Sequence, residues 1–117
     1  MYDLAANRPE PIPVYAEMGS VNPVIILPGA MQERHEALAK GLASSVTLGV
    51  GQFCTNPGIV IAPKHENVKH FLGQLDSSMK EQQLDSMLTM GIRESFGKSV
   101  DTLDAQAEVA LHTKVEA

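Results

Sequence analysis

Residues 22–29 read NPVIILPG: an unbroken apolar run, VIIL at 24–27, stands between an Asn-Pro pair and a Pro-Gly pair. Asn, Pro and Gly favour turns and interrupt regular structure. An apolar run between such signals is typical of a strand covered on both faces, as in a parallel sheet flanked by helices. A second run, IVIA at 59–62, also follows a Pro-Gly pair. We therefore predict two buried strands, at 24–27 and 59–62.

The segments that follow these strands have the apolar spacing of amphipathic helices. Good helix formers fill residues 30–46, with Met31, Leu38 and Leu42 along one stripe. After Pro63, apolar residues recur at i, i+3, i+4, i+7 and i+11 over residues 68–79, the strongest helical signal in the chain. A further helix is predicted over residues 84–103, where two glycines weaken its continuity.

Shorter elements are predicted at both ends of the chain. Three prolines at positions 9–13 exclude a helix and require an extended backbone. Residues 14–16 then read as a short strand, and the alternating pattern of residues 108–117 fits another. The order of strands and helices predicts an α/β fold, with mainly parallel strands and flanking helices. Because so few strands cannot complete such a sheet, we expect residues 1–117 to form an incomplete domain.

Composition narrows the classes of partner. A length of 117 residues suits at most one small domain. With 9 Lys and Arg against 14 Asp and Glu, the chain lacks the positive surface expected of a nucleic-acid binder. No apolar run approaches the roughly 18–20 residues of a membrane helix, and no signal peptide pattern is present. We therefore expect neither a nucleic-acid nor a membrane partner, and the single Cys fits a cytoplasmic location.

Cys54 and Glu17 are the residues most suited to chemistry. Cys54 lies in a turn-rich loop, residues 48–58, where backbone N–H groups with Gln52 and Asn56 could stabilise an anion formed beside the sulfur. A lone Cys is more often a small buried apolar residue, and Asn56 before Pro57 fits turn chemistry equally well. Glu17 follows the predicted strand at 14–16, where a carboxylate could act as a general base, although most Glu side chains are simply solvated.

Metal and dinucleotide motifs are not found. The four histidines, His35, His65, His70 and His112, show no ligand spacing, because even the pair at 65 and 70 is five positions apart rather than four. No metal site is therefore predicted. The GVG at 49–51 begins like a dinucleotide fingerprint, but it follows a predicted helix rather than a strand.

Two segments carry a family resemblance. EMGSVNP at 17–23 and GQFC at 51–54 resemble the two signature motifs of the aldehyde dehydrogenase superfamily, E-L-G-G-K-S-P and G-Q-x-C. Their order matches the family, as does the separation of 37 positions between the glutamate and the cysteine. The sequence of residues 8–23 and 51–58 is similar to sequences in the branch of α-ketoglutarate semialdehyde and NADP-dependent fatty aldehyde dehydrogenases. The resemblance implies that residues 1–117 are a partial catalytic domain.

The resemblance also implies roles. Cys54 would attack the aldehyde substrate to give a thiohemiacetal, a hydride would pass to NADP or NAD, and Glu17 would activate the water that hydrolyses the thioester. Met18 and Gly19 match motif positions near the nicotinamide, so they are cofactor-contact candidates. The complete enzyme is expected to be a homo-oligomer.

Some of the family's features are missing from the chain. Ser20, Val21 and Asn22 stand where the motif most often has Gly, Lys and Ser, so no role is carried over to them. The cofactor-binding and oligomerisation regions are expected outside residues 1–117, and the chain alone is expected to be inactive. Two alternatives stay open: a cofactor-independent thiol esterase, and a non-catalytic assembly fragment that pairs its unfinished sheet edges.

Overall fold

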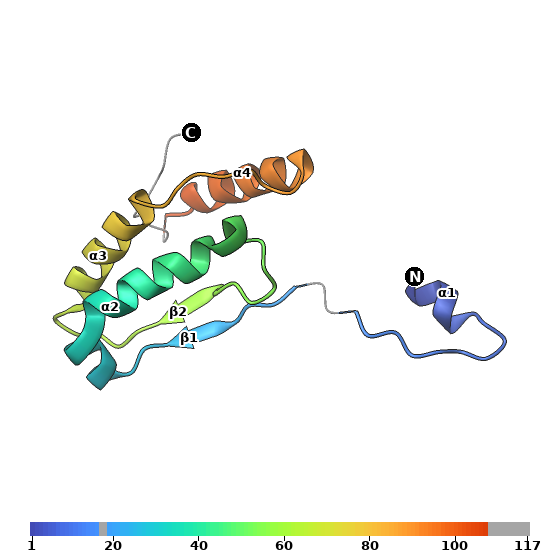
Figure 1. The fold of residues 1–117 in the computed structure, drawn as a ribbon, viewed down its shortest axis with the longest axis horizontal. Helices are drawn as coiled ribbons and strands as arrows, with labels where there is room; N and C mark the ends of the chain where they lie inside the picture. Colours follow the sequence, from blue (N-terminus) through green and yellow to red (C-terminus); the bar gives the residue numbers. More distant parts are fainter. Residues whose placement is uncertain (17–18, 108–117) are drawn as a thin grey trace.

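A computed structural model shows a two-stranded parallel sheet with helices along one side (Figure 1). The structure describes residues 1–16 and 19–107. In chain order the elements are α1 (Tyr2–Ala6), β1 (Pro23–Ile25), α2 (Pro28–Thr47), the short helical turn η1 (Leu48–Gly51), β2 (Ile59–Ile61), α3 (Val68–Lys80) and α4 (Met90–Asp104). The two strands run parallel, with Val24 opposite Val60, so the predicted α/β character with parallel pairing is confirmed for this small unit.

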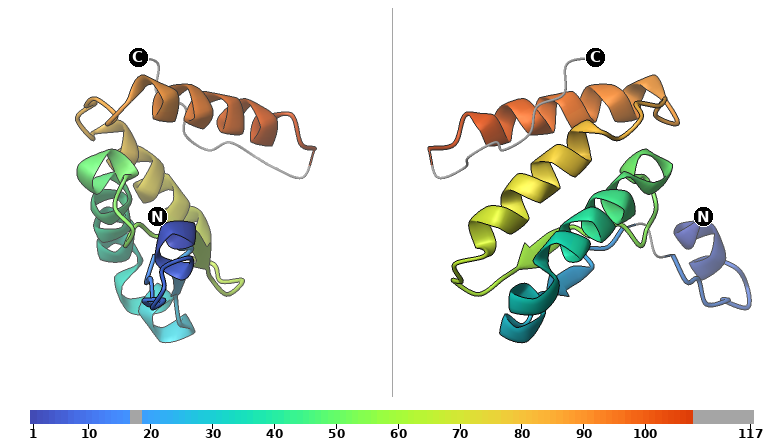
Figure 2. Two further views of the ribbon diagram at one scale, coloured as in Figure 1. Left: turned by 90° about the vertical axis from the view of Figure 1, so that its right-hand side faces the viewer. Right: turned by 60° about the vertical axis from the view of Figure 1, so that its left-hand side comes forward.

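The core lies where α2 and α3 pack side by side against the sheet (Figure 2). Met31 and Ala39 of α2 are fully buried, and Phe71 of α3 is 4% exposed. Partly buried apolar residues surround them: Val24, Ala30, Leu38, Leu42, Val68, Leu72 and Leu75. The apolar spacing predicted for α3 is therefore confirmed, because one stripe of this helix meets the matching stripe of α2.

The opposite face of the sheet is uncovered. Val24 packs against the core, so alternation along the strands places Ile25, Ile59 and Ile61 on the far side. These three side chains are 65%, 49% and 53% exposed, and we call them the open sheet face. The prediction that both strands are buried on two faces is wrong for the described part of the chain, because helices cover one face alone.

Two further predictions need correction. Residues 14–16 form no strand, because no described strand lies beside them to pair with. The helix predicted from residue 84 begins at Met90, where the Thr89 side chain caps it by accepting a hydrogen bond from the N–H of Ile92 at 3.2 Å. Within residues 1–16 and 19–107, α4 packs against no other helix or strand. The strand predicted at 108–117 lies outside the described residues.

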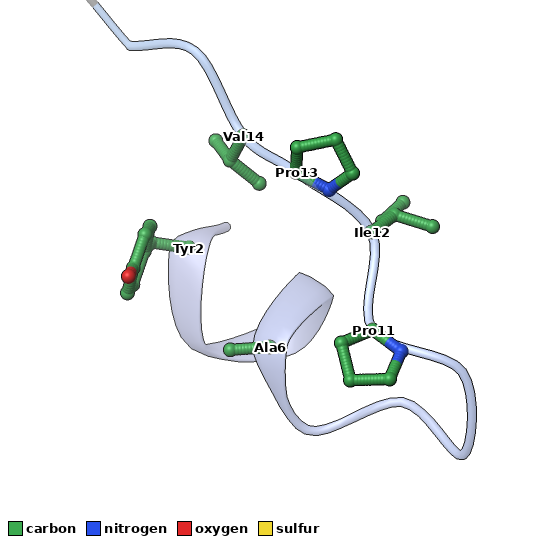
Figure 3. A pocket seen from close by; sticks show the side chains of 6 residues that line it. All are labelled: Tyr2, Ala6, Pro11, Ile12, Pro13 and Val14. Atoms are coloured by element: carbon green, nitrogen blue, oxygen red, sulfur yellow. The ribbon is translucent and has the colours of Figure 1, made fainter.

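The first 16 residues form an arm apart from the helix and sheet unit in Figure 1. Helix α1 and the proline-rich segment face each other across an open hollow of about 410 Å³ (Figure 3), lined by Tyr2, Ala6, Pro11, Ile12, Pro13 and Val14. With this arm, the radius of gyration is 18.4 Å, whereas a compact chain of this length would have about 13 Å. No described helix has the length and apolar character needed to cross a membrane.

Candidate active site

The loop that carries Cys54 begins with a left-handed turn at the end of α2. Gly49, Val50 and Gly51 have φ angles of 59°, 58° and 70°, a region that glycine adopts freely and a β-branched residue rarely does. This turn reverses the chain toward β2 (Figure 1). The Asn56 amide then fastens the loop to the end of α2 by donating to the carbonyl oxygen of Val46 at 2.7 Å.

Cys54 lies in a tight turn within this loop. The N–H of Asn56 donates to the carbonyl oxygen of Phe53 at 3.0 Å, which closes the turn around the cysteine. Cys54 is a free thiol and is exposed. The structure therefore presents Cys54 on the surface rather than in the core, so the interpretation of Cys54 as a small buried apolar residue is wrong.

The second half of the first motif lies directly against this turn. The Asn22 side-chain amide donates to the carbonyl oxygen of Cys54 at 2.6 Å and to that of Asn56 at 3.0 Å. The Ser20 hydroxyl donates to the same Cys54 oxygen, and the N–H of Gly58 donates to the carbonyl oxygen of Val21 at 2.7 Å. Both motifs lie on the N-terminal side of their strands: the first runs into β1 at Pro23, and the second ends shortly before β2 begins at Ile59. The strands are parallel neighbours, so the pairing of β1 with β2 brings the two motifs together.

Gly58 makes this close approach possible. A Cβ atom at this position would overlap the carbonyl oxygen of Val21, so any larger residue would push the two segments apart. Gly73 on α3 is different, because no heavy atom outside its own helical turn lies within 4 Å of its Cβ position.

Gly58→Ala is therefore expected to lower the free energy of unfolding by about 1–3 kcal/mol, the usual cost of overpacking. Gly73→Ala serves as the control and should stabilise the chain by about 0.5–1 kcal/mol, because alanine favours a helix interior. Urea unfolding followed by circular dichroism measures both. A Gly58→Ala chain as stable as the unmodified one would contradict the close approach.

The structure describes only some of the predicted site residues. Cys54 and Gly19 are described and exposed, whereas Glu17 and Met18 lie outside the described residues. Gln52 accepts a hydrogen bond from the N–H of Leu88 at 2.8 Å and donates to the carbonyl oxygen of Gly49 at 3.2 Å. Gln52 thus connects the loop to the segment before α4.

Ser20 and Asn22 were missed as site residues because they depart from the family motif. The available signal was chemical: both are short polar side chains that form hydrogen bonds to nearby backbone. Asn56 is fully engaged in the loop, which supports the turn interpretation of that residue over an anion-binding one.

The histidines give no metal cluster in the described part. His35 of α2 and His70 of α3 lie with ring centroids 6.1 Å apart, and the buried Nδ1 of His35 has no hydrogen-bond partner. His65 accepts a hydrogen bond from the N–H of Asn67. Among residues 1–16 and 19–107, no three His, Cys, Asp or Glu side chains gather as metal ligands. His112 lies outside these ranges.

Comparisons with known proteins match the motif resemblance. The chain is 44% identical over 96 residues to alpha-ketoglutaric semialdehyde dehydrogenase 2 of Azospirillum brasilense, covering 82% of the chain and 18% of that protein. It is 40% identical over 103 residues to alpha-ketoglutaric semialdehyde dehydrogenase of Acinetobacter baylyi, covering 88% of the chain and 20% of that protein. The chain thus spans about a fifth of the length of these curated relatives. No family model and no solved structure matches it. The resemblance inferred from the two motifs is confirmed.

Proposed function

We propose that this chain is the segment of an NAD(P)-dependent aldehyde dehydrogenase that carries the nucleophile, Cys54, and the general base, Glu17. The observation that carries this proposal is the contact between the two motifs, in which the Asn22 amide donates to the carbonyl oxygen of Cys54. Residues more than 30 positions apart are held together there, five positions after the glutamate. The names of the relatives point to a semialdehyde as the substrate.

In this proposal the thiol of Cys54 and the carboxylate of Glu17 act in different steps of the reaction. The sulfur adds to the aldehyde carbon and forms a thiohemiacetal, which becomes a thioester when its carbon loses hydride. Glu17 then takes a proton from water, and the water oxygen attacks the thioester carbon. The carboxylic acid leaves, and the thiol is regenerated. A weak base such as a carboxylate suits the second step, because water must lose its proton only as the new bond forms.

The proposal places Gly19 at the nicotinamide end of the cofactor. Gly19 is exposed, and no heavy atom lies within 4 Å of its Cβ position, so a flat ring could approach its backbone closely. NAD or NADP, when bound, accepts the hydride. The GVG at 49–51 forms the left-handed turn after α2 and does not open a helix after a strand, so it is not a phosphate-binding loop. The phosphate contacts would come from the rest of the enzyme, as would the contacts between subunits of a cytoplasmic homo-oligomer.

The experiment that tests this proposal compares the chain alone with the chain inside a relative. The purified chain is expected to form no NADPH or NADH from α-ketoglutaric semialdehyde, because it lacks the phosphate contacts and leaves Cys54 exposed to water. A chimera is then made in which the chain replaces the matching stretch of the Azospirillum brasilense enzyme. We expect the chimera to oxidise the semialdehyde, as measured by cofactor absorbance.

Two results would contradict the proposal. One is a folded chimera with no activity, and the other is an isolated chain whose activity disappears in Cys54→Ala. The matched control is the same chimera built with the corresponding segment of the Acinetobacter baylyi enzyme, which is about equally similar to this chain. It shows whether the host accepts a substituted segment at all.

The open sheet face favours one alternative, a non-catalytic assembly segment. Ile25, Ile59 and Ile61 form an exposed apolar surface on a sheet with two free edges. Sedimentation of the purified chain distinguishes the two proposals when it is combined with the chimera. Self-association together with an inactive chimera would favour the assembly role.

A further inference from the structure

We propose that Asn22 is a positioning residue of this site, whose amide holds the Cys54 turn in register with the segment that carries Glu17. The inference rests on the proposed function, because it gives a catalytic purpose to a contact that the structure shows. The sequence assigns Asn22 no role, since it departs from the family motif at this position.

Three acceptor oxygens surround the two N–H groups of the Asn22 side-chain amide. The Asn22 nitrogen lies 2.6 Å from the carbonyl oxygen of Cys54, 3.0 Å from that of Asn56 and 2.7 Å from the Ser20 hydroxyl oxygen. The Ser20 hydroxyl also donates to the Cys54 carbonyl. The half-buried Asn22 amide thus contacts the turn that contains Cys54 at two backbone carbonyls, those of Cys54 and Asn56.

The backbone of Asn22 also suits this role. Its φ of 43° lies in the left-handed region, which Asn adopts more readily than most residues. This bend directs the chain into β1 immediately after the motif, and the next strand along, β2, begins one residue after Gly58. A slip of β1 along β2 would therefore move the two motifs relative to each other, and the Asn22 bonds oppose that slip.

The Asn22 contact lies outside the hydrophobic core that stabilises the fold. Asn22 is not among the residues that pack around Met31 and Phe71 between α2 and α3. Its loss should leave that core intact and loosen only the relation between the two motifs. A nucleophile and a base lose rate when misplaced by about 1 Å, so this loosening matters to the chemistry.

The test uses Cys54 as its own reporter, since it is the single cysteine of the chain. Alkylation rates are measured at low salt with anionic iodoacetate and with neutral iodoacetamide, and their ratio reports the charge beside the sulfur. A carboxylate close to Cys54 repels the anionic reagent, so Glu17→Gln should raise the ratio about threefold. In an Asn22→Gly background, the effect of Glu17→Gln should fall well below threefold, because the Cys54 turn then keeps only the Ser20 and Gly58 bonds to the first motif.

The glycine substitution is chosen because glycine tolerates the positive φ, so the side chain with its amide is removed without backbone strain. Asn67→Ala is the matched control. Its amide also joins distant segments, through the carbonyl oxygens of Met31 and Gln32 at 3.5 and 3.4 Å, but it lies away from Cys54. In that background the threefold effect of Glu17→Gln should persist.

The outcomes separate this inference from the proposed function. A threefold effect that persists in Asn22→Gly overturns the positioning role. If Glu17→Gln has no effect even with Asn22 intact, the pairing of base and nucleophile fails. Hydrogen exchange of the Gly58 N–H then tests whether Asn22 holds the two motifs together, independently of Glu17. Asn22→Gly should accelerate this exchange about tenfold, with the unfolding midpoint of α2 and α3 little changed. An unchanged exchange rate would show that the Asn22 amide does not hold the two motifs together.

Discussion

Cys54→Ala in the chimeric enzyme is expected to reduce aldehyde oxidation by at least about a thousandfold, because alanine provides no atom that can form the thiohemiacetal. Glu17→Gln should lower the steady-state rate of aldehyde oxidation about 10²–10⁴-fold, since glutamine cannot take the proton from water. The two losses should differ in kind. Without the base, one turnover of cofactor reduction still occurs and the thioester accumulates, whereas without the sulfur no cofactor is reduced.

Rapid-mixing absorbance at one enzyme equivalent measures this difference, and mass spectrometry detects the acyl group on Cys54. Thr55→Ala is the control, because this neighbouring side chain is exposed in the same turn and has no part in the proposed chemistry. A Cys54→Ala chimera that still gives a burst of reduced cofactor would contradict the assignment of the nucleophile.

Met31→Ala is expected to lower the free energy of unfolding by about 2–5 kcal/mol, the range for truncating a buried methionine. Met31 is the largest side chain that is fully buried in the described part, and it lies in the contact between α2 and α3. The remaining core is small, so most of the chain's stability should disappear with it. Urea unfolding, followed by the helical circular dichroism signal, gives the change.

Met90→Ala is the matched control, because Met90 of α4 is 65% exposed and its truncation should change the unfolding free energy by about 0.5 kcal/mol or less. Equal losses for the two methionines would contradict the core described here. The same result would indicate that α4 is packed in solution rather than free of the other described elements.

The helices were the most predictable part of the fold. The stripe over residues 68–79 became α3, and the stripe through Met31 became the buried side of α2, because both patterns are set by neighbours three and four positions away. The beginning of α4 was less predictable, since the cap provided by Thr89 outweighed the apolar spacing that continued before it.

Strand burial was predictable only in part. The apolar runs at 24–27 and 59–62 correctly indicated two parallel strands, although the strands are Pro23–Ile25 and Ile59–Ile61, each shorter than its apolar run. Whether a strand is covered on one face or two depends on elements distant in the sequence, and here α2 and α3 cover a single face. An apolar run indicates the capacity to be buried, not the presence of a covering layer.

The candidate site, too, could be predicted from the sequence only in part. Glu17 and Cys54 were predicted from the two motifs and their resemblance to those of aldehyde dehydrogenases, and their roles stay predictions. The bonds from Asn22 and Ser20 to the Cys54 carbonyl, and the close approach of Gly58 to Val21, emerged only from the folded chain. They depend on two strands more than 30 residues apart meeting in one register, and no local pattern of residues records that meeting.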